Sequence, residues 1–405
     1  MLSTVSIRPT RVLRLPVGFF LLALLCGMAN PARSAISPQA ITPAGTWIPF
    51  GDITANGTDG QVNAMIELGG NVYAAGSFTH VGSVAANHIA RWDGSAWNTL
   101  GSGAQNGVDD VVSALATDGT NLYVGGIFQN AGGAAARRVA KWDGATWAAL
   151  GTGVGASGAG YFVNGLAVLG NRLYAVGDFN QAGGVFPLKN VAVYDLVAAT
   201  WGDVGGGVNT TAKSAIAYQG LLYVGGQFTT AAGGTVATKF IAAWTGSAWT
   251  PVSSGTDGEV DAMAVIGSTL YAGGGFAHAN GTSTLVHHIA RLNGSWSAMG
   301  TGMSTTSGDT VRALTAVGPL LYIGGTFTSA NGVAATNLAQ WDGSQFASVG
   351  VAAENGVDGT VFALSPFGRD VMVGGLFAHD GQEVSSNIAR WQSDVLFADG
   401  FDGVP

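Results

Sequence analysis

The sequence predicts an all-β fold, a seven-bladed β-propeller made of four-stranded antiparallel blades. Three observations predict it. One segment of about 50 residues recurs seven times, each copy contains four short runs of β-forming residues, and the two ends of the chain supply complementary parts of one copy. Together these observations place the propeller in residues 46–394.

The repeat is clearest in segments of the type Leu-Tyr-Val-Gly-Gly-x-Phe, as in residues 122–128. The phenylalanine that closes this segment recurs at intervals of 50, 51, 49, 48, 51 and 50 residues. The seven copies close at Phe78, Phe128, Phe179, Phe228, Phe276, Phe327 and Phe377. A period this regular indicates stacked copies of one structural unit. The glycines recur with it, so the 65 glycines in 405 residues are architectural and do not mark low complexity.

Each copy contains four short β-type runs, which we name strands a to d. In the second copy they cover residues 112–115, 122–128, 139–142 and 147–150, with Gly, Asn and Asp clusters between them. Helical periodicity is absent. Strands c and d are separated by Asp-Gly at residues 93–94, 143–144 and 342–343, which predicts tight hairpins with both residues at positive φ. Each copy is therefore expected to form a four-stranded meander.

A meander with apolar residues on both faces needs neighbouring sheets on either side to cover them. The tryptophans support radial stacking, because all 11 fall at equivalent places on strands c and d. Those on strand c are Trp92, Trp142, Trp244, Trp341 and Trp391, and those on strand d are Trp47, Trp97, Trp147, Trp201, Trp249 and Trp296. We interpret them as packing between blades, since aromatic side chains bury the largest area per residue.

The ends of the chain predict that the ring is closed. The seventh copy reaches strand c at residues 387–391 but has no strand d after it. The missing strand lies at the other end, where Thr-Trp-Ile-Pro-Phe-Gly (residues 46–51) matches Ala-Trp-Asn-Thr-Leu-Gly (residues 96–101). The N-terminal strand is therefore expected to complete the last blade, which removes the open sheet edges.

The first 35 residues have the pattern of a secretory signal peptide. Arg8, Arg11 and Arg14 precede an apolar run at residues 15–29, and Ala-Arg-Ser-Ala follows at 32–35. The run is shorter than the roughly 20 residues of a membrane span, and no later segment is long and apolar enough. We expect cleavage near residue 35, with a linker at 36–45, a short tail of open role at 395–405, and a protein secreted, periplasmic or on the cell surface.

The cysteine content limits the disulfides that can stabilise the chain, and the net charge limits the classes of partner that it can bind. Cys26, the single cysteine, lies in the predicted signal peptide, so the remaining chain has no disulfide to hold it. The net charge is −8 for the whole chain, and without residues 1–35 it is 12 − 24 = −12. This charge excludes nucleic acids and anionic membranes as expected partners. The expected partner is an extracellular protein or polysaccharide, with no membrane insertion and a monomeric chain.

Two repeated strings carry a resemblance to known proteins: Leu-Tyr-Val-Gly-Gly-x-Phe, and Ile-Ala-x-Trp-Asp-Gly-x-x-Trp. They resemble kelch-like propellers, and more specifically bacterial exported repeat proteins grouped with the cortical cell-polarity marker family. The resemblance covers residues 46–394. It implies a propeller in an exported or surface context, and it implies no reaction, because propellers host many functions.

Polar residues in two sets of loops form the candidate site. In a meander propeller the d-to-a and b-to-c loops emerge on one face, which we call the loop face. These loops carry Asp59, Asp109, Asp257, Asp309 and Asp358, and His80, His278 and His379. Carboxylates with nearby histidines could coordinate a divalent cation or bind a polar ligand such as a glycan. The alternative is that the aspartates serve ordinary turns and the histidines are solvated loop residues.

No catalytic signature is present: the sequence lacks G-x-S-x-G, H-E-x-x-H, a P-loop and an EF-hand loop. No cofactor is identified, although a divalent cation remains a candidate. The sequence therefore favours a non-enzymatic scaffold that binds its partner through the loop face. Two alternatives stay open: a hydrolase or lyase acting on an extracellular polymer with these Asp and His residues, and a structural envelope protein.

Overall fold

The computed structural model describes residues 45–50, 56–156, 160–350, 355–381 and 383–393. The predicted signal peptide (1–35), most of the linker and the tail (395–405) lie outside the described residues. Within the described part the chain forms strands and two short 3₁₀ turns, at Gly103–Gln105 and Ala232–Gly234, and no α-helix. That part accordingly has no helix suited to crossing a membrane.

Seven four-stranded antiparallel sheets follow one another along the chain, and each is one blade. Strand a of blades 1 to 7 is β2 (Val62–Leu68), β8 (Val112–Thr117), β14 (Phe162–Leu169), β18 (Ala212–Tyr218), β24 (Val260–Ile266), β30 (Thr310–Val317) and β36 (Thr360–Phe367). Strand b is β3 (Asn71–Gly76), β9 (Leu122–Gly126), β15 (Arg172–Asp178), β19 (Leu221–Gly226), β25 (Thr269–Gly274), β31 (Leu320–Thr326) and β37 (Asp370–Leu376). Strand c is β6 (Ile89–Trp92), β12 (Val139–Trp142), β16 (Val191–Asp195), β22 (Ile241–Trp244), β28 (Ile289–Asn293), β34 (Leu338–Trp341) and β40 (Ile388–Ser393). Strand d is β7 (Trp97–Thr99), β13 (Trp147–Ala149), β17 (Thr200–Asp203), β23 (Trp249–Pro251), β29 (Ser295–Ala298), β35 (Phe346–Ser348) and, for blade 7, β1 (Gly45–Ile48).

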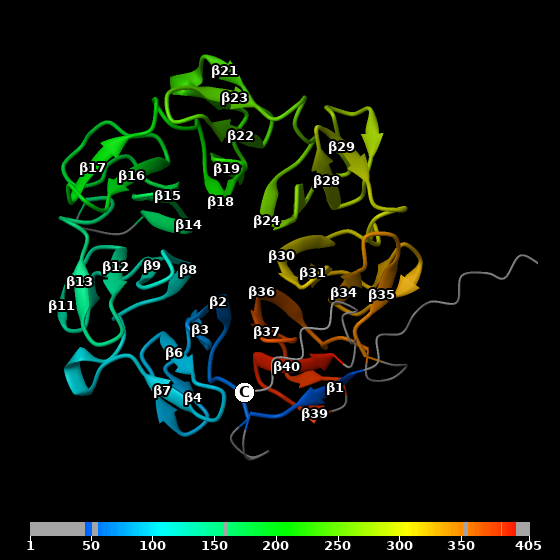
Figure 1. Ribbon diagram of the computed structural model, residues 1–405, viewed down its shortest axis with the longest axis horizontal. Coiled ribbons are helices and arrows are strands. Elements are labelled where there is room, and N and C mark those ends of the chain that lie inside the picture. Colours follow the sequence, from blue (N-terminus) through cyan, green and yellow to red (C-terminus); the bar gives the residue numbers. More distant parts are fainter. Residues whose placement is uncertain (1–44, 51–55, 157–159, 351–354, 382, 394–405) are drawn as a thin grey trace, which may run out of the picture. The chain divides into compact units, whose positions relative to one another are not determined.

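The blades form a closed ring with strand a innermost (Figure 1). Each a strand packs against the a strands of both neighbouring blades, and β2 of blade 1 packs against β36 of blade 7. Blade 7 is completed by β1, which pairs antiparallel with β40 in the register Trp47 to Trp391. The prediction that the ring is closed by the N-terminal strand is confirmed.

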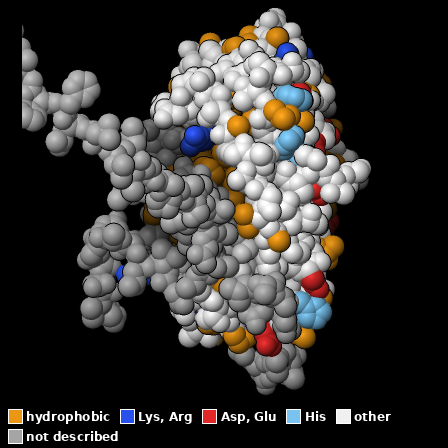
Figure 2. Space-filling view, turned by 90° about the vertical axis from the view of Figure 1, so that its right-hand side faces the viewer, with side chains coloured by type: hydrophobic (Ala, Val, Ile, Leu, Met, Phe, Trp, Pro, Cys, Tyr) orange, Lys and Arg blue, Asp and Glu red, His pale blue; other side chains and the backbone are white. Residues whose placement is uncertain are grey.

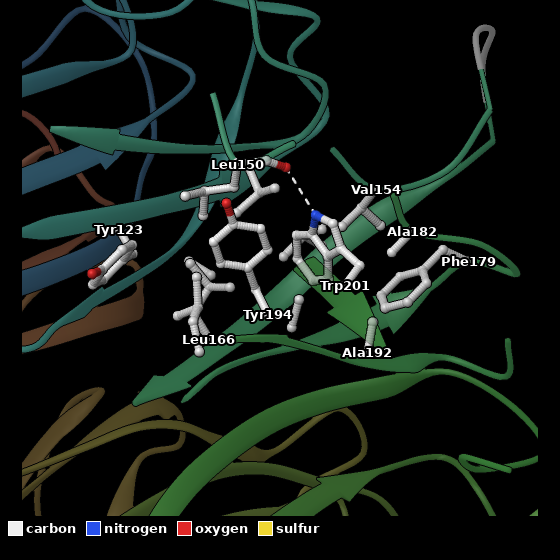
Figure 3. Packing of buried hydrophobic residues seen from close by; sticks show 14 of the residues in the cluster. Tyr123, Leu150, Val154, Leu166, Phe179, Ala182, Ala192, Tyr194 and Trp201 are labelled. Atoms are coloured by element: carbon white, nitrogen blue, oxygen red, sulfur yellow. Dashed lines mark hydrogen bonds between the residues drawn. The ribbon is translucent and has the colours of Figure 1, made fainter. Parts of the chain in front are cut away.

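Four tryptophans of strand d, namely Trp147, Trp201, Trp249 and Trp296, join neighbouring blades through hydrogen bonds as well as packing. Trp201 of blade 3 packs against Tyr194 of its own blade, and its indole Nε1 donates to the backbone oxygen of Leu150 in blade 2 at 2.8 Å (Figure 3). Trp147 and Trp249 donate in the same way to the preceding blade, at 2.9 and 2.7 Å. These residues thus satisfy a carbonyl at the end of strand d while they fill the space between two sheets.

Close approach between blades also requires glycine in strand b. A Cβ added at Gly225 would lie 2.7 Å from Cγ1 of Val260, which belongs to strand a of the next blade. The same holds at Gly125, where a Cβ would lie 2.6 Å from Cγ1 of Val163. At these two junctions the valine at the start of the next a strand fills the space that the glycine leaves, so the two sheets touch near the ring's centre. At the junction of blades 3 and 4 the sizes are exchanged, because strand b has Val176 and the next strand a begins with Ala212.

The turn between strands c and d differs from the prediction. Residues 93–96 form a four-residue connection in which Gly94 has a φ of 100° while Asp93 is not at positive φ. The Asp93 carboxylate instead accepts hydrogen bonds from the backbone N–H groups of Ser95 and Ala96, both at 2.9 Å. Aspartate is therefore used for its side-chain acceptor, and only the glycine for its backbone freedom.

Candidate functional site

The predicted loop face is built by seven equivalent connections. In each blade the segment entering strand a lies against the b-to-c loop of the same blade, and a single backbone bridge joins them, such as Thr256 to Ala279 in blade 5. The b-to-c loops of six blades also form two-residue hairpins. These are β4 (His80–Val81) with β5 (Val84–Ala85), β10 (Asn130–Ala131) with β11 (Ala134–Ala135), β20 (Thr230–Ala231) with β21 (Val236–Ala237), β26 (His278–Ala279) with β27 (Thr284–Leu285), β32 (Ser329–Ala330) with β33 (Val333–Ala334), and β38 (His379–Asp380) with β39 (Glu383–Val384).

Four of the five candidate aspartates tie these two loops together. Asp257 Oδ1 accepts the backbone N–H groups of Ala277 and His278, both at 2.8 Å. The same pair of bonds is made by Asp59, Asp109 and Asp358. In blade 4, which has no candidate aspartate, the amide oxygen of Asn209 accepts the equivalent bonds. These side chains serve as links between loops within one blade.

The candidate histidines pair with these aspartates one to one. Nδ1 of His278 and of His379 lies 2.7 Å from Oδ2 of Asp257 and of Asp358, and the His80–Asp59 distance is 3.2 Å. Figure 2 shows histidines next to carboxylates along one edge of a surface that is otherwise largely uncharged. The pairs stay in separate blades, and the described residues contain no group of three or more His, Cys, Asp or Glu placed to hold a metal ion.

Hydrogen bonds keep these carboxylates ionised. Burial raises the pKa of Asp59, but hydrogen bonds from Thr79 and His80 outweigh it and lower the pKa to about 2. The pKa values of Asp109, Asp257 and Asp358 are lowered in the same way, by donors from their b-to-c loops. Asp59 makes four such contacts and each of the other three aspartates makes three, so these carboxylates have little acceptor capacity left for a ligand.

Asp309 does not occupy the position that its spacing predicts. Its Oδ2 accepts the backbone N–H of Thr306 at 2.9 Å, within its own loop. The equivalent of the other four aspartates in blade 6 is Ser304, whose hydroxyl accepts the N–H of Thr328 at 3.0 Å. In blade 6 the linking residue stands seven positions before the valine near the start of strand a (Ser304 to Val311), against three positions in blade 5 (Asp257 to Val260), and spacing from strand a therefore aligned the wrong residue.

A second site, which the sequence analysis missed, lies where the seven a strands converge. Every a strand has a β-bulge near its start, which points the extra residue into a central pocket of about 280 Å³. The seven bulge residues are Asn63, Ser113, Asn164, Lys213, Asp261, Arg312 and Phe362. Because strand a begins at the loop face, these side chains form the mouth of the central channel on that face.

Three consecutive bulge residues are charged, and they form one cluster with Glu259. Lys213 Nζ lies 2.8 Å from both Glu259 Oε2 and Asp261 Oδ1. The Arg312 guanidinium lies over the Phe362 ring at 5.5 Å, and its buried Nε has no hydrogen-bond partner among the described residues. We call Lys213, Glu259, Asp261 and Arg312 the channel cluster.

The pKa values of the two carboxylates of the channel cluster are shifted in opposite directions. Burial raises the pKa of Asp261 more than Lys213 lowers it. For Glu259, hydrogen bonds from Lys213 and Gln227 outweigh burial, and the pKa falls. Burial lowers the pKa of Lys213, but its hydrogen bonds to the two carboxylates raise it overall. Aligning the copies on the small apolar residue before each bulge, which is alanine in blade 4 and valine in the others, would have revealed these charges. A simple alternation of inward and outward residues does not reveal them, because each bulge interrupts the alternation.

Comparison with known proteins supports the fold. No family model matches the chain, and no curated protein matches it. Among solved structures it is similar to the WD40 beta propeller domain of Doa1, at 12% identity over 87% of this chain and 98% of that one, with a TM-score of 0.51. The fold is that of a β-propeller. A chain from a crystal structure of the mitotic checkpoint complex matches at 16% identity over 93% of this chain and 99% of that one, with a TM-score of 0.50. The extracellular domain of the putative one component system BT4673 from B. thetaiotaomicron matches at 12% identity and a TM-score of 0.48, over 85% of this chain and 39% of that chain, so this chain spans about two fifths of it.

Proposed function

We propose that this protein is an exported, non-enzymatic propeller of kelch-like type that binds an extracellular polysaccharide or protein on its loop face. The observation that carries the proposal is the channel cluster. Its four charged groups are partly buried at the point where all seven blades meet, while the equivalent residues of four blades are uncharged. Buried ion pairs stabilise a fold little compared with apolar packing. Their concentration on one side of the channel mouth is better explained by ligand recognition.

The free hydrogen-bonding capacity of the cluster supports this role. Arg312 Nε is buried and lacks a partner among the described residues, and Asn63 and Asn164 lie on the same ring of bulge residues. A ligand with hydroxyl, amide or carboxylate groups could complete these bonds. The paired histidines on the outer loops are less suited to the role, because each Nδ1 is already engaged by an aspartate.

A thermal-shift screen against soluble polysaccharides, secreted proteins and divalent cations tests the proposal. A ligand at about 100 times its dissociation constant should add roughly 2.7 kcal/mol to the free energy of unfolding. We expect this shift to disappear when Lys213→Gln and Asp261→Asn are combined, a change that removes both charges and keeps groups able to hydrogen-bond. The control is Asp257→Asn, because Asn209 already makes the same bonds in blade 4.

The outcomes separate the two candidate sites. A shift that survives in the Lys213 and Asp261 variant but is lost on His80→Ala with His379→Ala would contradict the channel mouth and place the ligand on the outer loops. The absence of a shift with every polysaccharide and every cation would contradict those two classes of ligand and leave a protein partner, which a pull-down from the cell surface would then identify.

One observation favours a second candidate, a hydrolase or lyase for an extracellular polymer. Glu259 and Asp261 share Lys213 and have pKa values displaced in opposite directions, an arrangement that enzymes use for acid and base roles. Release of reducing ends by the wild-type protein, lost in both Glu259→Gln and Asp261→Asn, would support this candidate over the scaffold.

A further inference from the structure

The junction of blades 2 and 3 departs from the repeat at three places that contact one another. The first is Arg138, which precedes strand c of blade 2 with a φ of 59°. Blades 3, 6 and 7 have asparagine here, and its side-chain amide donates one bond to the next connecting segment, as in Asn190 to Val208. Arg138 donates to three carbonyls instead: those of Val154 (2.9 Å), Ala156 (3.0 Å) and Tyr161 (3.1 Å). Its side chain is only 1% exposed.

The second departure is Gly155, which stands where blades 1, 2, 5 and 7 have the linking aspartate. A Cβ at this position would lie 2.9 Å from Cγ of Tyr161 and 3.0 Å from Nη1 of Arg138. The ring of Tyr161 and the guanidinium of Arg138 fill the space that an aspartate side chain would need in blade 3. The Arg138 guanidinium also lies over the Tyr161 ring, 5.4 Å from its centre. Arg138, Gly155 and Tyr161 therefore pack against one another beside the entry to strand a of blade 3.

The third departure is the residue that this segment presents, Phe162. Its side chain is 43% exposed at the first position of β14. At the equivalent position the other blades carry Gln61, Val111, Thr211, Glu259, Thr310 and Thr360. Phe162 borders a pocket of about 430 Å³ whose lining includes Asp110, Ile127, Gln129, Arg138 and Tyr161. This volume is within the range of small-molecule sites. Exposure of a large aromatic ring costs solvation free energy, and a fold tolerates it where a ligand covers the ring.

We propose that this pocket binds a neutral pyranose unit of a polysaccharide, with Phe162 as the surface on which the sugar ring stacks. The inference rests on the proposed scaffold function and names the chemistry of its ligand. A pyranose ring presents C–H groups on its faces and hydroxyls around its edge. The aromatic face of Phe162 can pack against the C–H groups, and the carboxylate of Asp110 and the amide of Gln129 can hydrogen-bond to the hydroxyls.

Charge selects a neutral sugar over an acidic one. Asp110 adds a negative charge to the pocket, the Arg138 guanidinium is buried against backbone carbonyls, and the chain has a net charge of −8. An anionic polymer would be repelled at this site. A protein partner is less well matched, because a stable protein interface needs about 1,000 Å² with clustered anchors, whereas this is a single ring beside a compact pocket.

Affinity electrophoresis in native gels tests the proposal with defined probes: laminarin, hydroxyethyl cellulose, galactomannan, xyloglucan and dextran as neutral polymers, and alginate and polygalacturonate as acidic ones. We expect at least one neutral polymer to retard the wild-type chain and neither acidic polymer to do so. Phe162→Ala should weaken the retardation about tenfold or more, while Phe162→Tyr, which keeps the ring, should retain it. Thr360→Ala, the equivalent position in blade 7, is the matched control and should change nothing.

Each outcome decides between the subsite and the scaffold. Retardation that survives Phe162→Ala but is lost in the Lys213 and Asp261 variant would overturn this subsite and leave the proposed function intact. Retardation by acidic polymers alone, or by no polymer, would overturn the neutral-sugar proposal, whatever protein the chain is later found to bind. Unchanged thermal melting of Phe162→Ala is expected, since the side chain is exposed, and it excludes misfolding as the cause of a loss.

Discussion

Removal of residues 46–51 is expected to lower the free energy of unfolding by about 5 kcal/mol or more, which is comparable to the whole stability of many domains. The deletion takes away Trp47, whose ring packs edge-on against Trp391 at 5.2 Å, and Phe50, which packs between Trp92 and Trp97 of blade 1. It also leaves β40 as an open edge and breaks the link between the two ends of the ring. Urea unfolding followed by tryptophan fluorescence measures the change.

The control for this deletion is Thr46→Ala. Thr46 is exposed, and its hydroxyl bonds only to the neighbouring carbonyl of Trp47 among the described contacts, so its loss should leave the urea midpoint unchanged. A deletion variant with the wild-type midpoint would show that the seven-bladed ring does not depend on the N-terminal strand.

Replacement of Asp380 by alanine is expected to stabilise the protein at alkaline pH by on the order of 2–4 kcal/mol. Asp380 is 2% exposed in the b-to-c hairpin of blade 7. At the same place the other six blades bury Val81, Ala131, Ala182, Ala231, Ala279 and Ala330. Burial raises the pKa of Asp380 to about 7. The nearby Glu383 charge adds to this rise, and a hydrogen bond from Ser385 and the charge of His379 oppose it.

The direction of the pH dependence follows from this raised pKa. Well below pH 4 the carboxyl group is protonated in both the folded and the unfolded chain, so no charge is buried and the free energy of unfolding is not lowered on that account. As the pH rises to about 7 and above, the unfolded chain ionises freely while the folded chain must bury the charge, so the wild type loses stability. Thermal melting should therefore show Asp380→Ala above the wild type by several degrees at about pH 8.5 and close to it at about pH 4. A gain of equal size at both pH values would contradict burial of the charge as its cause.

The architecture was predictable because it depends on period and composition. The recurring phenylalanine gave the number of blades, and the Trp-Ile-Pro-Phe-Gly string at residues 47–51, which matches the end of a repeat but precedes the first one, indicated how the ring closes. The c-to-d turn was mispredicted because Asp93 works through its side chain, which a rule about backbone angles does not consider.

The functional residues were harder to predict for a geometric reason. Asp59 and His80 are 21 residues apart and pair within one blade, so nothing in their spacing shows that they satisfy each other. Lys213 and Asp261 meet only because two β-bulges turn both side chains into the channel. The sequence of a single strand shows neither a bulge nor a contact between blades. Residues that depart from the repeat, such as Arg138 and Phe162, can be recognised once the seven copies are aligned.

The central claim, that the ligand is held on the loop face, can be tested most directly by blocking one face at a time. With Cys26 replaced by Ser, a single cysteine is placed at Leu376, which is 56% exposed at the loop-face end of β37, or at Thr120, in the exposed turn between strands a and b on the opposite face. Each protein is labelled with a bulky polyethylene glycol maleimide, and its affinity for the ligand found in the screen is measured. We expect the label at position 376 to abolish binding and the label at position 120 to leave it unchanged. Binding blocked from position 120, or unaffected by position 376, would contradict it.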